Sequence, residues 1–381
     1  MASSRPIVVA LIDSGINVYH EAFRGGSPNV PGVQASPVVL SKEGEHAELV
    51  ERDAPTWSAL EEGILYAFPG TRVLGISFGG GNGSPILDTN GHGTATASLL
   101  AWTAPDVVIV SVQIHGVYCI DRPGECVVDP SVADAMQWVS EQPWIDVVSL
   151  SLAGLPAKPR VSPIEPESER FIAASRAAAD AGMLIVNGAG NHPVSSTSDY
   201  FPGVPWVIAV GGSQGAKHGA TVVNNKLFDV AANVTAEVAR EDSTTDTYWT
   251  AGTSMSTPVV AGTLAIAKGA LAGSPRADLL NDPTTLRETL RDMLNASATR
   301  WGPTDYTPLA QQDPDPVLDW VDPAVPVVAG PAQLGWGHVD GTTGLLMADV
   351  LWGRAELPAA PAEYSAFMAQ YQAHREMLWE R

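Results

Sequence analysis

Short runs of consecutive apolar residues alternate along this chain with longer segments of helical character. Residues 7–12 are apolar throughout and end at a polar turn, so they predict a buried strand. Helices are expected at about residues 129–139, which begin at Asp129-Pro130, and at about 169–181, which end at Gly182. Further buried strands are expected at residues 72–78, 106–113, 146–152, 183–186 and 206–210.

Two more helices are expected because small or apolar residues cover all their sides. Residues 93–102 have the composition of a buried helix, and residues 254–270 that of a helix at the centre of a large domain. Strands that alternate with helices in this way predict an α/β fold, with a mostly parallel sheet and helices on both faces.

Three segments are less regular. Residues from about 25 to 71 are rich in Glu, and within them Ser58 and Glu61 fit a capping box, so a short helix is expected to run on towards Phe68. Residues 303–329 are rich in Pro and Asp and predict a long surface loop. The chain from about Leu351 is expected to be helical, with a Pro/Ala hinge at residues 357–361.

Composition narrows the classes of partner. The chain has 381 residues, of which 42 are acidic and 21 basic, and its formal net charge is −21. This charge argues against nucleic acid and anionic membrane as partners, and it fits either basic peptide substrates or a simple need for solubility. No run reaches the roughly 18 apolar residues of a membrane span.

Two features bear on the compartment. Residues 1–6 lead directly into the first strand without the pattern of a secretory signal, which predicts a cytoplasmic protein unless the sequence has been trimmed. Cys119 and Cys126 are too few for a disulfide scaffold. They flank the turn signal Pro123-Gly124, and two interpretations remain open: a disulfide across a small hairpin, or two free thiols.

Three short motifs supply an acid, a base and a nucleophile. Asp13 follows the first strand, where active-site groups gather in an open α/β sheet. His92 lies between two glycines, which allow close approach of a substrate. Ser254 begins a helix, whose positive end helps to stabilise an oxyanion. A turn aspartate, a packed histidine and an N-cap serine are the simpler interpretations taken singly. Together the three residues favour Ser-His-Asp catalysis, which needs no cofactor.

The motifs resemble those of the subtilisin-like serine peptidases, which share the chain order Asp, His, Ser. Asp13 matches the family's acid, His92 its base, and Ser254 the nucleophile in Gly-Thr-Ser-Met-x-x-Pro. The segment Gly188-Ala189-Gly190-Asn191 resembles the family's oxyanion segment. The resemblance therefore implies that the Asn191 amide and the backbone N–H of Ser254 hold the oxyanion.

A substrate-binding surface is implied by the same resemblance. One wall would be the strand that pairs with the substrate backbone, and the other would be Gly188, Ala189 and Gly190. Ala153 stands where the family usually has a glycine, which would narrow the primary specificity pocket slightly. The residues that match the substrate strand are Ser149, Leu150, Ser151, Leu152, Ala153 and Gly154.

The resemblance spans about residues 6–349 and implies a subtilisin-like three-layer fold. We expect a catalytic domain at residues 1–349, with an insertion at about 24–71, and a C-terminal helical extension at 350–381. We expect neither the inhibitory prodomain that usually precedes secreted members of the family nor the calcium-binding loop after the His helix, so no metal site is expected. Asp229 begins a degraded form of another family motif, which we expect to alter a surface turn.

We therefore predict a serine endopeptidase that acts on a peptide or protein without a cofactor, in a specific intracellular role such as the maturation of a peptide precursor. Two alternatives belong to other classes. One is a non-catalytic peptide-binding scaffold, against which the intact set of catalytic residues argues. The other is a peptide ligase or cyclase, in which an amine replaces water at the acyl-enzyme.

Overall fold

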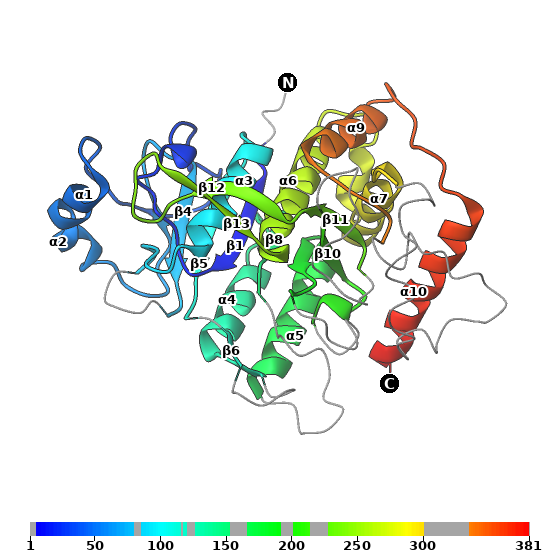
Figure 1. Cartoon of the computed structure of the whole chain (residues 1–381), viewed down its shortest axis with the longest axis horizontal. Coiled ribbons are helices and arrows are strands. Elements are labelled where there is room, and N and C mark those ends of the chain that lie inside the picture. The colour runs from blue at the N-terminus through cyan, green and yellow to red at the C-terminus, as the bar shows by residue number, and fades with distance from the viewer. Residues whose placement is uncertain are drawn as a thin grey trace.

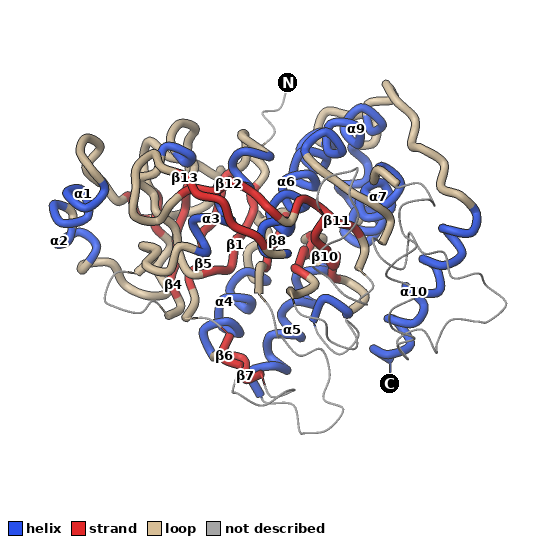
Figure 2. The backbone as a smooth tube through the Cα atoms, in the orientation of Figure 1, coloured by secondary structure: helices blue, strands red, loops and turns tan. Residues whose placement is uncertain are grey.

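A sheet of nine strands crosses the molecule (Figures 1 and 2). The computed structural model describes residues 5–79, 85–115, 117–119, 126–152, 166–191, 201–213, 228–300 and 335–380. The strands of the sheet are β1 (Val8–Asp13), β2 (Ser36–Pro37), β3 (Tyr66–Ala67), β4 (Val73–Ser77), β5 (Val108–Gln113), β8 (Val147–Leu150), β9 (Leu184–Gly188), β10 (Val207–Ser213) and β11 (Val230–Asn233).

The sheet is almost entirely parallel. Its strand order is β11-β10-β9-β8-β1-β5-β4-β3-β2, and every neighbouring pair is parallel except β3 and β4. Strand β1 lies in the centre, and all of its residues are buried. A strand covered on both faces is a continuous apolar run in the sequence, so the strand predicted at residues 7–12 is confirmed.

Helices cover both faces of the sheet. Alternate residues of β1 point to opposite sides: Val9 and Leu11 pack in the same cluster as α3 and α6, whereas Ala10 and Ile12 pack with α4 and α5. The predicted α/β fold with helices on both faces is confirmed. The helices of the first side are α3 (His92–Thr103), α6 (Thr253–Leu271), α7 (Pro283–Ser297) and α9 (Gly341–Leu351), and those of the second are α4 (Pro130–Ser140) and α5 (Pro166–Asp180).

Local sequence explains where these helices begin and how they pack. Asp129 accepts a hydrogen bond from the backbone N–H of Ser131 at 2.9 Å and so caps α4, whose first residue is Pro130. Helix α6 is apolar on all sides because it packs against the sheet, α3 and α9 together. The predicted helices at 129–139 and 254–270 are both confirmed.

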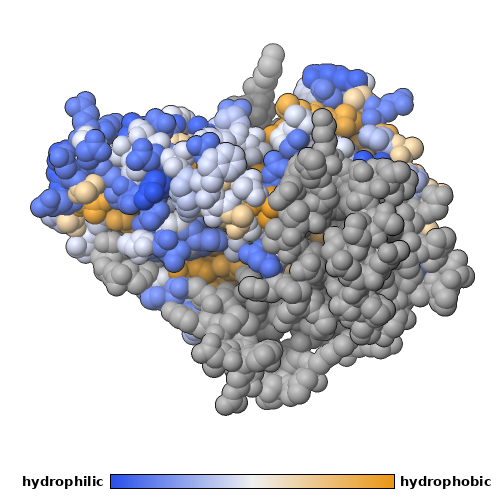
Figure 3. Space-filling view, viewed as in Figure 1, coloured by the Kyte–Doolittle hydropathy of each residue, from blue (hydrophilic) through white to orange (hydrophobic). Residues whose placement is uncertain are grey.

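The segment predicted to be an insertion carries two short helices, α1 (His46–Arg52) and α2 (Ala54–Trp57), at one end of the molecule (Figure 1). The helix predicted to run from Ser58 towards Phe68 is wrong. Ser58 Oγ donates to the carbonyl of Ala54 at 2.8 Å and does not cap a new helix. Trp57 and Phe68, at the two ends of the stretch, are both buried, and their rings lie 5.8 Å apart. Figure 3 shows this end of the molecule as mostly hydrophilic.

Helix α10 (Ala362–Glu380) lies at the opposite end (Figure 1) and is held by Arg375, whose side chain is 1% exposed. The guanidinium donates to both oxygens of Asp229, at 3.2 and 3.0 Å, and to the carbonyls of Gly203, Val204 and Val207. Arg291 of α7 contacts the same carboxylate at 2.7 Å.

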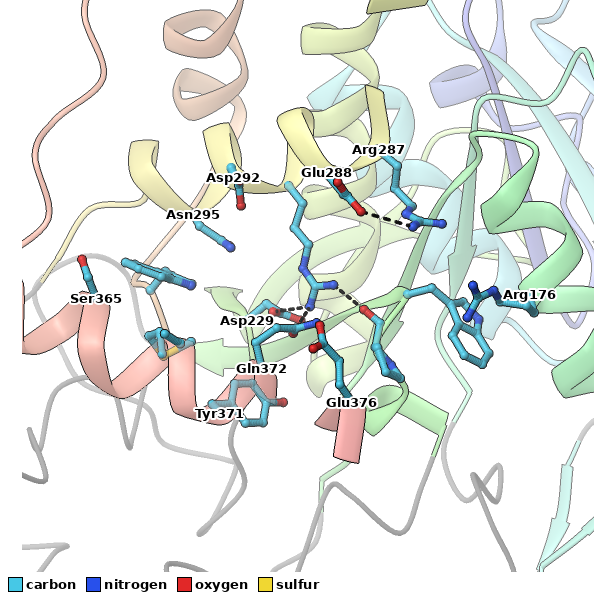
Figure 4. A pocket seen from close by; sticks show the side chains of 16 residues that line it. Arg176, Asp229, Arg287, Glu288, Asp292, Asn295, Ser365, Tyr371, Gln372 and Glu376 are labelled. Carbon is cyan, nitrogen blue, oxygen red and sulfur yellow. Dashed lines mark hydrogen bonds and ion pairs between the residues drawn. The ribbon is translucent and has the colours of Figure 1, made fainter. Parts of the chain in front are cut away.

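Asp229 is therefore a buried anchor, 3% exposed, that leads directly into β11, and the expectation of a surface turn at this point is wrong. Burial alone would raise the pKa of Asp229, but the charges of Arg291 and Arg375 hold it below its usual value. A cavity of about 530 Å³ lies between α7 and α10 beside this network (Figure 4).

Two antiparallel ribbons lie outside the main sheet. Strands β12 (Thr235–Ala239) and β13 (Thr247–Ala251) form one, which packs on α3 (Figure 1). Strands β6 (Val117–Cys119) and β7 (Cys126–Val128) form the other, with the backbone of Cys119 directly opposite that of Cys126. This register is compatible with the hairpin expected from the sequence, and the disulfide itself stays a prediction.

Some expectations fall outside the described residues, namely the long loop at 303–329 and the placement of Ala153 and Gly154. Among the residues that are described, no helix is both long and apolar enough to cross a bilayer.

Candidate active site

Asp13 and His92 meet at the carboxyl end of the central strand. Asp13 is the last residue of β1 and is 3% exposed, and His92 is the first residue of α3. The Nδ1 atom of His92 lies 2.8 Å from Oδ1 of Asp13. The side chain of His92 is 36% exposed, so its ring joins a buried carboxylate to the surface of the protein.

The surroundings of Asp13 define the tautomer of His92. Oδ1 of Asp13 also accepts from the backbone N–H of Ser14 at 2.8 Å, and Thr96 Oγ1 lies 3.1 Å from Oδ2. An ionised carboxylate only accepts hydrogen bonds. Nδ1 of His92 therefore carries the proton, and its Nε2 has a lone pair available to accept a proton from another group.

Asp88, which none of the sequence motifs indicated, holds the turn that precedes His92. Its Oδ1 accepts from Ser14 Oγ at 3.0 Å and from the backbone N–H groups of Asn90 and Gly91, each at 2.9 Å. Its Oδ2 accepts from the backbone and the hydroxyl of Thr94, at 2.8 and 2.7 Å. An Asp followed by Asn-Gly before a helix is a turn and capping signal that could have identified it.

The charges of these two carboxylates act on His92. The charge of Asp13 raises the pKa of His92 above its usual value, and burial opposes this by lowering it. The hydrogen bond to Asp13 and the charge of Asp88 also raise the pKa of His92. The positively charged imidazolium is therefore stabilised at this position.

Ser254 lies in the first turn of α6, half-buried beside the segment that follows β8. Its hydroxyl donates to the carbonyl of Ser151 at 3.4 Å, and Ser151 Oγ donates to the carbonyl of Ser254 at 2.9 Å. Within the described part of the chain no hydrogen bond joins the Ser254 hydroxyl to His92. Such contacts are often long in free enzymes and shorten when substrate binds.

Asn191 is exposed, and its amide has a defined orientation. Its Oδ1 accepts from the backbone N–H of Thr253 at 2.8 Å and from Thr253 Oγ1 at 3.0 Å. Because a backbone N–H only donates, the oxygen must face Thr253, and the amide nitrogen is left to donate elsewhere. A Cβ atom placed on Gly252 would lie 3.1 Å from that nitrogen, so the glycine leaves room for the amide.

The expected substrate-binding residues have different surroundings. The side chains of Ser149 and Leu150 are buried in the sheet, whereas Ser151 contacts Ser254 and Leu152 is half-exposed. Strands β8 and β9 are neighbours, with Leu150 paired to Asn187, so the segments that follow them leave the sheet side by side. Gly188, Ala189 and Gly190 continue from β9 to Asn191.

A family model described as the Subtilase family matches residues 4–315. The chain belongs to the subtilase family. This membership places it among the serine peptidases. No curated protein matches this subtilase in sequence. Among the described residues, no group of three His, Cys, Asp or Glu side chains is placed to hold a metal ion.

Several solved structures are similar to this subtilase. The epidermin leader peptide processing serine protease EpiP from Staphylococcus aureus is 14% identical, with a TM-score of 0.52 over 91% of this chain and 76% of that one. The prenylagaramide maturation protease PagA is 14% identical, with a TM-score of 0.48 over 90% and 94%. A cold-adapted subtilisin-like serine proteinase is 19% identical, with a TM-score of 0.47 over 80% and 85%. The family match and the likeness to EpiP confirm the predicted subtilisin-like fold.

Proposed function

We propose that this subtilase is a serine endopeptidase whose catalytic residues are Asp13, His92 and Ser254. The observation that carries the proposal is the 2.8 Å contact between Asp13 and Nδ1 of His92, which leaves Nε2 as the base. In this mechanism Ser254 Oγ attacks the scissile carbonyl while Nε2 takes its proton. The same nitrogen then gives the proton to the leaving amine, and water repeats the sequence on the acyl-enzyme. Asp13 holds the tautomer and stabilises the imidazolium.

The proposed oxyanion hole consists of the Asn191 amide nitrogen and the backbone N–H of Ser254. Thr253 supports this role, because its N–H holds the oxygen of Asn191 at 2.8 Å and so turns the nitrogen away from itself. A donor that is already oriented stabilises the tetrahedral intermediate without having to reorganise during the reaction.

We further propose that the substrate backbone lies along the segment from Ser149 to Gly154, opposite Gly188–Gly190. Ser151 supports this placement, since its hydroxyl donates a hydrogen bond to the backbone carbonyl of Ser254 at 2.9 Å. Residues 1–349 would form the catalytic domain and residues 350–381 an extension. For the biological role of the protein, we propose the cleavage of a defined peptide precursor in the cytoplasm, as distinct from general protein digestion.

Labelling with a fluorophosphonate probe tests the activity directly. The wild-type protein is expected to form one adduct, at Ser254, and Ser254→Ala none, with both proteins showing the same circular dichroism spectrum. Peptide hydrolysis should fall in parallel, because removal of the nucleophile costs a subtilisin about 10⁶ in turnover. An unlabelled wild-type protein that still binds peptides would favour the scaffold alternative.

Cleavage of a peptide library, read by mass spectrometry, tests the substrate proposal. Hydrolysis at one narrow set of sites is the expected result. Cleavage without sequence preference would contradict a processing role, and joined or cyclic products would identify a ligase.

A further inference from the structure

The loop between β12 and β13 brings a carboxylate to the turn that precedes His92. Gly91 directly precedes His92 and has a φ of 94°. A Cβ atom placed on Gly91 would lie 2.7 Å from Oε2 of Glu241, so the carboxylate of Glu241 packs directly against this glycine. Only a glycine fits here, both for its backbone conformation and for the space that Glu241 occupies.

The loop that carries Glu241 is held by the segment that follows β1. The side-chain amide of Asn17 donates to the carbonyls of Arg240 and Ser243, at 3.2 and 2.7 Å. The backbone N–H of Glu21 donates to the carbonyl of Thr244 at 2.9 Å. The position of Glu241 is therefore fixed relative to the His92 turn before any substrate arrives.

The negative charge of Glu241 is not neutralised by the residues that the structure describes. None of them donates a hydrogen bond to it or forms an ion pair with it. The neighbouring cation, Arg240, is already bonded to Asp242 at 2.8 and 3.0 Å. Burial raises the pKa of Tyr248, and the charges of Glu241 and Asp88 raise it further. The charge of Arg240 lowers it by less, so the potential around Tyr248 is net negative.

The position of the Glu241 carboxylate suits contact with substrate residues that follow the scissile bond. The segment from Ser149 to Gly154, along which the substrate is proposed to lie, also borders the expected primary specificity pocket, which takes the residue before that bond. Glu241 belongs to a separate element that packs on α3, beside the residue that gives a proton to the leaving amine. A half-buried carboxylate without a partner attracts a cation more strongly than a fully solvated one does, because less water screens it.

We infer that Glu241 selects substrates that carry Lys or Arg among the first residues after the scissile bond. This inference rests on the proposed peptidase function and extends it to a class of substrate. A carboxylate near the N-terminus of a helix also stabilises that helix, and such a role would affect the melting temperature without affecting selectivity.

Fluorogenic peptides that differ only in Arg or citrulline test the inference, because citrulline keeps the shape of Arg and removes its charge. The pair is placed in turn at each of the three positions on either side of the cleavage site. The wild-type protein is expected to prefer Arg by about tenfold in kcat/KM at a position after the scissile bond. The preference should fall as salt is added.

Glu241→Gln is expected to remove the preference for Arg over citrulline in kcat/KM, and Glu241→Lys to reverse it. Glu237→Gln is the matched control, because Glu237 lies exposed on the same ribbon and accepts a hydrogen bond from Thr247. It should keep the wild-type ratio. A wild-type protein that cleaves peptides without preferring Arg after the bond, or a Glu241→Gln protein that keeps the preference, overturns the inference alone. A protein that neither cleaves any peptide nor reacts with the fluorophosphonate overturns the proposed function as well.

Discussion

Thr253 determines which atom of the Asn191 amide is left to donate elsewhere, because its backbone N–H donates to Asn191 Oδ1 at 2.8 Å. Asn191→Leu is expected to lower kcat by about 10²-fold with little change in KM, since the amide acts mainly in the transition state. Steady-state kinetics on one peptide check this. Thr253→Val, which keeps the backbone donor and loses only the hydroxyl, should have a smaller effect. A change confined to KM would contradict the assignment.

The acid limb of activity is expected to lie above the ordinary pKa of histidine. Asp13 raises the pKa of His92 from 6.5, and the base works only when Nε2 is unprotonated, so kcat/KM should rise with pH through a value higher than 6.5. Asp13→Asn should shift this limb to lower pH and reduce kcat by about 10⁴-fold. A limb that stays in place would show that another group controls it.

The same pair affects stability in a defined pH window. His92 has a raised pKa in the folded state, so its attraction to Asp13 stabilises the fold fully below pH 6.5 and is lost as the pH rises through the folded value. Urea denaturation of the wild-type and His92→Gln proteins at several pH values measures this. The difference in unfolding free energy between them should shrink as the pH increases.

Asp88 is expected to be a positioning residue. Asp88→Asn would place an amide N–H near the donors of Gly91 and Thr94, so the turn before His92 should shift and kcat should fall about 10- to 100-fold. Because the charge of Asp88 also raises the pKa of His92, the acid limb should move to lower pH, though by less than in Asp13→Asn. A fall in melting temperature with an unchanged pH profile would indicate a purely structural role.

Arg375 is expected to contribute strongly to stability. Arg375→Met removes one of the two arginines that pair with the buried carboxylate of Asp229, and loss of one partner of a buried pair costs about 3–5 kcal/mol. Chemical denaturation of the full chain measures the loss. Arg354→Ala is the control, because its pair with Asp349 is exposed and should be worth less than about 1 kcal/mol. Equal effects of the two substitutions would contradict a docked α10.

The local pattern of apolar residues was enough to predict the strands and helices that are buried on all sides. Strands β1, β5 and β8 are mostly apolar because helices cover both faces of the sheet, and α6 is apolar all round because it packs against the sheet, α3 and α9 together. Asp13, His92 and Ser254 could be singled out because each stands in a short motif whose neighbours serve the same chemistry.

The remaining features depend on partners that are distant in the chain. Arg375 and Asp229 are 146 positions apart, and nothing near either residue signals the contact. Asp88 is recognisable as a turn residue, but its bond to Ser14 spans 74 positions. Trp57 and Phe68 are eleven positions apart, which fits helical spacing, but both are buried in the main core without a helix between them, so the pattern predicted a helix that does not form there.

The central place of β1 has a consequence for synthesis on the ribosome. This strand pairs on one side with β5 and on the other with β8, and Asp146, which precedes β8, follows Val8 by 138 positions. At 5–20 residues per second the second edge of the apolar strand waits roughly 7–28 s for that partner. A nascent chain stalled before Asp146 emerges therefore presents a hydrophobic strand with one edge unpaired, which is the kind of segment that chaperones bind.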